Sequence, residues 1–219
     1  MLPDDGGRAR FLILPPMQLD EFWDLFRKQT AEIDWLQWIS TILGVAEVLL
    51  ARVNNILLYP AGITSSLIAS FLLYKANLYA ESVLNGYYVA MSLYGWWYWS
   101  RKKDDPPTPI SHTTNREWMI VTVIIAGGFA LLYVLLRRFT PSTVPGWDAW
   151  VSATAWAGTW LLARRKIENW ILLNVSNIFA IPLLYYKHLT PYAVLTVFLF
   201  IVACFGYFDW RKRYKLQTA

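Results

Sequence analysis

Seven apolar segments constrain this chain more than any other feature, because each is close to the length that a helix needs to cross a bilayer. A helix rises about 1.5 Å per residue, so about 20 apolar residues span a hydrocarbon core of roughly 30 Å. The segments are 35–51, 56–75, 78–100, 117–137, 147–163, 168–187 and 190–210. They predict an all-α integral membrane protein with seven transmembrane helices.

The composition favours the same class and disfavours the soluble ones. Hydrophobic residues make up 56% of the chain and charged residues only 16%, whereas soluble domains carry about 25% charged residues. In a membrane protein the placement of Lys and Arg matters more than a net charge of +5, so we expect a lipid bilayer and no nucleic acid as partner.

The sequence offers no recognisable catalytic or metal-binding pattern. It has a single cysteine, Cys204, and its two histidines, His112 and His188, fall in predicted loops. There is no Ser–His–Asp order, no Gly-rich phosphate loop and no paired Cys or His. We therefore expect a protein that is not an enzyme and that has no metal and no cofactor.

The apolar segments form two similar sets of three. The matching stretches are 38–52 with 150–164 and 71–75 with 183–187, both at the same offset in sequence, and 94–103 with 205–213 after a slip of one residue. Three helices end on the opposite side of the membrane from where they begin, so the segment between the sets serves as a linker helix. The pattern predicts a 3+1+3 parallel repeat, an arrangement that places the substrate between the repeats near the bilayer midplane.

This organisation divides the chain into four parts. They are an N-terminal tail at 1–34, the first three-helix repeat at 35–100, a linker with the fourth helix at 101–137, and the second repeat at 147–213. Within the tail, residues 18–32 predict a short amphipathic helix at the membrane surface, with a partly ordered tail as the alternative.

The positive charges in the loops predict the orientation. Lys and Arg are densest in 101–103, 164–166 and 211–215, which lie on the same side of a seven-helix topology. The positive-inside rule then places the C-terminus in the cytoplasm and the N-terminus outside. We expect a multi-pass protein of the inner (plasma) membrane.

A polar stripe on the third segment is the strongest indication of a solute site. Its members follow one another at steps of four, three, four and four residues and share one helical face: Glu81, Asn85, Tyr88, Ser92 and Trp96. Such a stripe is costly inside a membrane unless it faces protein, water or a ligand. It therefore predicts one wall of a solute-binding site.

The sixth and seventh segments supply candidates for a second wall. Trp170, Asn174 and Asn177 lie on one face of the sixth segment, and Thr196 with aromatic neighbours lies on the seventh. An aromatic cage suits a flat solute with a delocalised positive charge. The alternative is that these polar groups only join helices to one another, at about 0.6 kcal/mol each.

Two carboxylates stand apart from this pattern as candidate charges or gates. Glu81 is expected near the outer mouth of the pathway. Glu47 lies in the middle of the first segment, where its counterpart in the second set is Thr159. For Glu47 both a structural role and a role in transport remain open.

Several motifs resemble the PnuC family of vitamin transporters. They are RVNNILLYPAGI at 52–63, LYAESVLNGYYVAMSLYGWWYW at 78–99, ENW at 168–170 and GYFDW at 206–210. The resemblance covers roughly residues 35–213. Many members have Gln where this chain has Asn85, a shorter amide.

The resemblance implies a function and a mechanism. Members of the PnuC family transport nicotinamide riboside, a precursor of NAD, or thiamine and related vitamins. Their fold is similar to that of the SWEET sugar carriers. It implies substrate contacts from the third, sixth and seventh helices and facilitated diffusion by alternating access. It also implies a functional link to a cytoplasmic kinase that traps the vitamin. A receptor that binds without transport is the alternative, and assembly into a homo-oligomer is left open.

Overall fold

The computed structural model describes residues 19–101, 109–140 and 142–218, and these residues form eight helices without a β-strand. Seven of the helices coincide with the seven apolar segments to within a few residues at nearly every boundary, and α8 continues beyond its segment to Thr218. In chain order they are α1 (Leu19–Ala31), α2 (Trp35–Arg52), α3 (Leu58–Lys75), α4 (Tyr79–Ser100), α5 (Asn115–Phe139), α6 (Pro145–Ala163), α7 (Asn169–Tyr186) and α8 (Thr190–Thr218).

Length and composition alone single out fewer membrane spans than the seven segments predict. Among the described helices, α5 and α8 are each long and apolar enough to cross a bilayer, and α1 with α2, bent by 108°, counts as a third if the pair forms one span. The remaining helices, α3, α4, α6 and α7, do not meet this criterion of length and composition.

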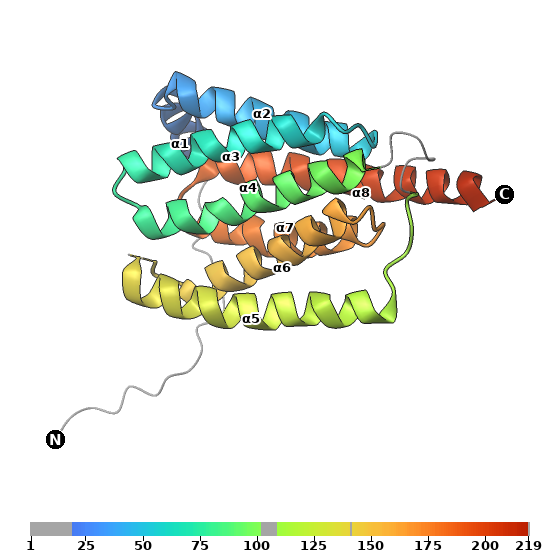
Figure 1. Ribbon diagram of the computed structural model, residues 1–219. Coiled ribbons are helices and arrows are strands. Elements are labelled where there is room, and N and C mark those ends of the chain that lie inside the picture. The colour runs from blue at the N-terminus through green and yellow to red at the C-terminus, as the bar shows by residue number, and fades with distance from the viewer. Residues whose placement is uncertain (1–18, 102–108, 141, 219) are drawn as a thin grey trace.

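Six helices close into a ring (Figure 1). Around it α2 packs on α3, α3 on α4, α4 on α6, α6 on α7, α7 on α8, and α8 returns to α2. Helix α5 lies outside the ring, mainly against α6, and α8 extends beyond the other helices at the C-terminal end. The ring therefore has an interior that is bounded by both sets of three helices.

The short turns of the ring recur at a fixed offset in sequence. Asn54 corresponds to Arg165, and Asn77 corresponds to His188 at the same offset; all four have left-handed backbone conformations, with φ between 54° and 60°. Each follows a helix end and closes it with two backbone hydrogen bonds, as in a Schellman motif. Both sets of three helices thus use the same turns at the same places.

Close contacts between helices recur at the offset of the turns. Tyr59 of α3 packs on Gly95 of α4, where an added Cβ would overlap the tyrosine ring. Trp170 of α7 packs on Gly206 of α8, where an added Cβ would lie 2.7 Å from the indole. Each glycine admits a large aromatic side chain from its neighbour, so a larger residue there would force the two helices apart.

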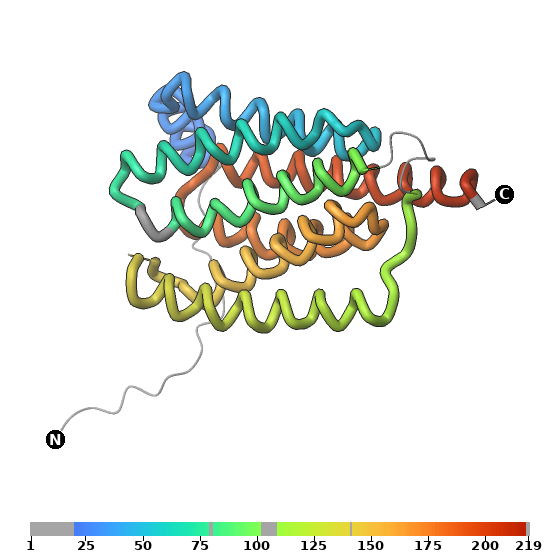
Figure 2. The backbone as a smooth tube through the Cα atoms, viewed as in Figure 1, coloured from blue at the N-terminus to red at the C-terminus, as the bar shows by residue number. Residues whose placement is uncertain are grey.

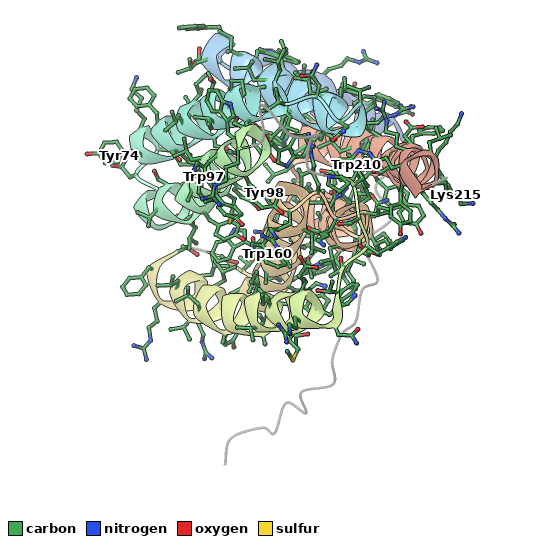
Figure 3. The ribbon with its side chains drawn as sticks, turned by 45° about the vertical axis from the view of Figure 1, so that its right-hand side comes forward. Tyr74, Trp97, Tyr98, Trp160, Trp210 and Lys215 are labelled. Atoms are coloured by element: carbon green, nitrogen blue, oxygen red, sulfur yellow. The ribbon has the colours of Figure 1, made fainter. Side chains whose placement is uncertain are left out.

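Two buried tryptophans join one set of helices to the other. Trp99 of α4 donates its indole N–H to the carbonyl of Ala163 (3.1 Å), and Trp210 of α8 donates to the carbonyl of Ala51 (3.0 Å). Figure 3 shows Trp210 among the helices, whereas Tyr74 lies at the edge of the bundle. These bonds satisfy carbonyls at the ends of α6 and α2 and fix the α4–α6 and α8–α2 seams.

A short strap, residues 109–114, ties α5 to the turn between α6 and α7. Ser111 donates its backbone N–H to Arg165 and accepts one from Ile167, both at 3.1 Å. Beyond the strap, Glu117 of α5 forms a buried ion pair with Lys166 at 2.9 Å. Figure 2 shows the tube running along this end of the bundle before α5 begins.

Helix α1 is an ordered part of the structure and not a loose tail. It packs against α8, and Gln29 accepts hydrogen bonds from the backbone N–H and the hydroxyl of Thr190 at 3.1 and 2.8 Å. Phe22 stacks on Tyr185 near the end of α7. Leu19–Ala31 form a helix within residues 18–32, where an amphipathic helix is expected, and its position at the membrane surface stays a prediction.

Candidate functional site

A cavity of about 710 Å³ lies between α4, α5 and α6. It is found at the end of the bundle where α4 and α6 begin and where α5 and α7 end. Its lining combines apolar side chains with polar ones, and most of the polar ones lie near helix ends. The lining residues are Leu73, Leu78, Glu81, Leu84, Asn85, Tyr88, Leu132, Leu136, Thr140, Ser142, Thr143, Asp148, Ser152, Trp156, Lys187 and Leu189.

Three residues of the predicted polar stripe, Glu81, Asn85 and Tyr88, line this cavity. The amide nitrogen of Asn85 donates to the carbonyl of Ser66 (2.8 Å) and to the hydroxyl of Ser70 (3.0 Å), both on α3. Its Oδ1 accepts no hydrogen bond from the described residues, so this oxygen is the atom of Asn85 that remains for a solute.

Aromatic side chains form the wall at the α4–α6 seam. Tyr87 stacks on Trp156 with ring centroids 4.4 Å apart and an angle of 19° between the planes, and its hydroxyl donates to the carbonyl of Trp156 at 2.9 Å. Tyr88 packs against the same cluster. Sequence reasoning missed Trp156 and Ser152 because α6 carries no polar stripe, and only the packing of α6 on α4 brings them to the site.

The mouth of the cavity carries two carboxylates and one ammonium group. Asp148, in the first turn of α6, contacts Nζ of Lys187 through both carboxylate oxygens at 2.6 and 2.7 Å and accepts a hydrogen bond from Ser142. Glu81 lies in the first turn of α4. This charge balance favours a cation over an anion at the mouth.

The remaining predicted residues do not line this cavity. Ser92 and Trp170 are buried, and Trp96 is 42% exposed. Asn174 donates to the sulfur of Cys204 at 3.3 Å, and Thr196 bonds within its own helix. Asn177 is half-buried on α7, which makes no packing contact with α4 in the described ring. The two polar stripes therefore do not pack against each other in the described helices.

The opposite end of the ring is filled by aromatic side chains. Tyr59 contacts Trp99 (centroids 5.2 Å apart), Trp99 contacts Trp210 (6.4 Å), and Trp210 contacts Trp170 (5.7 Å). We call these four residues the aromatic plug. All four are buried, and they come from α3, α4, α7 and α8, so the plug joins both sets of helices.

The plug contains polar atoms without partners. The hydroxyl of Tyr59 and the indole N–H of Trp170 are buried and have no hydrogen-bond partner among the described residues, and the same holds for Oδ1 of Asn174 one turn further along α7. Unpaired buried polar groups are costly. A solute that reached this level would find donors and an acceptor available.

Comparison with known proteins places the chain in a family. A family model described as nicotinamide mononucleotide transporter matches residues 34–212. The chain belongs to this family. It is 20% identical over 176 residues, 68% of its own length and 74% of the relative's, to the nicotinamide riboside transporters PnuC of Escherichia coli (strain K12) and Shigella flexneri.

A solved structure has the same fold. The crystal structure of the vitamin B3 transporter PnuC is similar with a TM-score of 0.67 over 89% of this chain and 90% of that one, at 21% sequence identity. Since the members of the family are transporters, the chain is a multi-pass membrane transporter and not an enzyme.

Proposed function

We propose that the protein carries nicotinamide riboside across the membrane by facilitated diffusion with alternating access. The observation that carries the proposal is a cavity with an open mouth at one end of the ring and an aromatic plug at the other. A carrier of this type opens its site to one side at a time. We infer the substrate from the relatives, which are named as nicotinamide riboside transporters.

We further propose that the transporter is built as a 3+1+3 parallel repeat. Its parts are the tail at 1–34, the repeat at 35–100, the linker and α5 at 101–137, and the repeat at 147–213. The turns and the aromatic–glycine contacts, which recur at one shared offset in sequence, support this division. The position of α5 outside the ring suits a linker helix.

The proposed site changes as the carrier turns over. Asn85 and Tyr88 contact the solute while the cavity is open, together with Trp156, and Glu81 attracts it at the mouth. Opening of the plug then exposes the deeper candidates, which are Ser92, Trp170, Asn174, Asn177 and Thr196. We leave Trp96 out of the site, because it is exposed and does not line the cavity.

We propose that the cavity opens to the outside of the inner (plasma) membrane. The clusters at 101–103, 164–166 and 211–215 then lie in the cytoplasm with the C-terminus, in accord with the positive-inside rule. Net uptake without an energy source needs a cytoplasmic kinase that phosphorylates the vitamin and so prevents its return. Assembly into a homo-oligomer is compatible with this arrangement.

Uptake into liposomes that contain the purified protein tests the proposed substrate. We expect labelled nicotinamide riboside to enter faster than into protein-free liposomes and unlabelled riboside to compete. Labelled thiamine is the matched comparison, because it also carries a permanent positive ring. Faster entry of thiamine would assign the protein to that vitamin, and binding of the riboside without entry would indicate a receptor.

A further inference from the structure

Glu47 of α2 has an interior position that the cavity alone does not explain. Its carboxylate packs directly on Gly62 of α3, where an added Cβ would overlap it. The side chain is partly exposed and has no hydrogen bond or ion pair with any described residue. An ionised carboxylate without a partner at this depth is costly in a membrane protein.

The other set of helices shows that packing does not require this carboxylate. Gly158 of α6 and Leu173 of α7 follow Glu47 and Gly62 at the same offset as the paired turns, and they form the same kind of contact with the glycine on the opposite helix. One large side chain on one glycine is enough to join these helices. The counterpart of Glu47 is therefore Gly158, and not Thr159 as the sequence alignment indicates.

Glu47 lies beside the aromatic plug. Gly62, on which its carboxylate packs, is one turn along α3 from Tyr59, a member of the plug. The charge of Glu47 also acts on the hydroxyl of Tyr88, which lines the cavity. Glu47 thus stands beside the route between the cavity and the plug, where aromatic rings suit a flat cation.

We propose that Glu47 is the counter-ion of the positively charged ring of the substrate while the solute passes from the cavity toward the plug. The proposal rests on the proposed function and adds a specificity-determining residue to it. Attraction between opposite charges is strong where water is excluded. Glu47 therefore selects the cationic riboside over a neutral molecule of the same shape.

The test compares nicotinamide riboside with its 1,4-dihydro form, which has nearly the same shape and no charge on the ring. Equilibrium binding of both is measured for the purified wild-type protein and for Glu47→Gln. We expect the affinity for the cationic riboside to fall by about tenfold or more, and that for the dihydro form to change by less than about twofold. An equal loss for both ligands would overturn the proposal, and so would no loss for either.

A second variant guards against failure of the first to fold. Glu47→Gly combined with Gly62→Leu copies the contact of Gly158 with Leu173 and leaves no carboxylate. We expect it to fold and to show the same selective loss. Retention of the wild-type preference for the cation in this variant would contradict the proposal.

Two control arms distinguish a counter-ion from an ion-coupling residue and from a failure of transport itself. Wild-type uptake of the riboside that requires Na⁺, and loses that requirement in Glu47→Gln, would assign Glu47 to a coupling ion and overturn the proposal. Failure of the wild-type protein to transport any riboside would count against the proposed function alone, because the ratio of the two binding affinities is measured without transport.

Discussion

The amide of Asn85 has two roles in an otherwise apolar helix bundle, one for its nitrogen and one for its oxygen. The nitrogen ties α4 to Ser66 and Ser70 of α3, and the oxygen accepts no hydrogen bond from the described residues and is available to a solute. We expect Asn85→Leu to weaken binding of nicotinamide riboside by roughly two- to tenfold, the worth of one hydrogen bond. Titration calorimetry of the purified variant provides the measurement.

Ser82→Ala is the matched control for Asn85. Ser82 also joins α4 to α3, through the carbonyl of Ser70 at 2.8 Å, but it does not line the cavity. We expect it to leave the affinity unchanged. If Asn85→Leu binds as tightly as Ser82→Ala, Asn85 has no contact with the solute.

Single residues also show how much of the site could be predicted from the sequence. Helical spacing was enough to predict that Glu81, Asn85 and Tyr88 share a face, since that depends only on local geometry. It could not show that Trp156 and Asp148 complete the site, because their place depends on how α6 packs against α4. It also could not separate Trp96, which is exposed and does not line the cavity, from the three members of the stripe that do.

At the scale of elements, one carboxylate adds to the backbone hydrogen bonds of Ser111 that hold the strap before α5. Glu168, just before α7, accepts hydrogen bonds from the backbone N–H (2.8 Å) and hydroxyl (2.6 Å) of Thr113 and contacts Nδ1 of His112 at 2.7 Å. Burial raises the pKa of Glu168, but the hydrogen bonds from Thr113 and His112 outweigh it and hold the pKa below its ordinary value of 4.5.

This lowered pKa predicts that acid releases the strap. The stabilisation from Glu168 is fully present above the unfolded-state pKa near 4.5 and is lost as the pH falls through the lower folded-state pKa. We expect the amides of residues 110–114 to exchange with deuterium faster, after correction for intrinsic rates, below about pH 4 than at pH 7.

Thr113→Ala provides the control for the strap. It removes the hydroxyl that bonds Glu168, so exchange at pH 7 should already be faster and should depend less on pH. Equal protection of the strap at both pH values in the wild-type protein would show that Glu168 does not hold it.

At the scale of the whole molecule, the sequence predicted the order and length of the helices well, because apolar length sets both. The offset in sequence between the two repeats was predicted less accurately. Matching of LLAR with LLAR indicates an offset that is one residue longer than the offset at which the turns and packed glycines recur. The ends of the first two helices of each set also recur at the shorter offset: α2 ends at Arg52 and α6 at Ala163, and α3 ends at Lys75 and α7 at Tyr186.

The ring itself could not be predicted from one sequence. It depends on the α4–α6 and α8–α2 seams, which the indole bonds of Trp99 and Trp210 fix. Nothing in the spacing of those tryptophans indicates a partner 64 or 159 residues away. The 3+1+3 repeat remains a prediction that these contacts support.

A counterflow experiment tests the central claim of alternating access most directly. Liposomes that contain the protein are loaded with unlabelled nicotinamide riboside and diluted into buffer with a trace of labelled riboside, without any ion gradient. A carrier that exposes one site to each side in turn predicts a transient accumulation of label inside, above its outside concentration. A simple approach of the label to equal concentrations, without an overshoot, would contradict the account and indicate a channel.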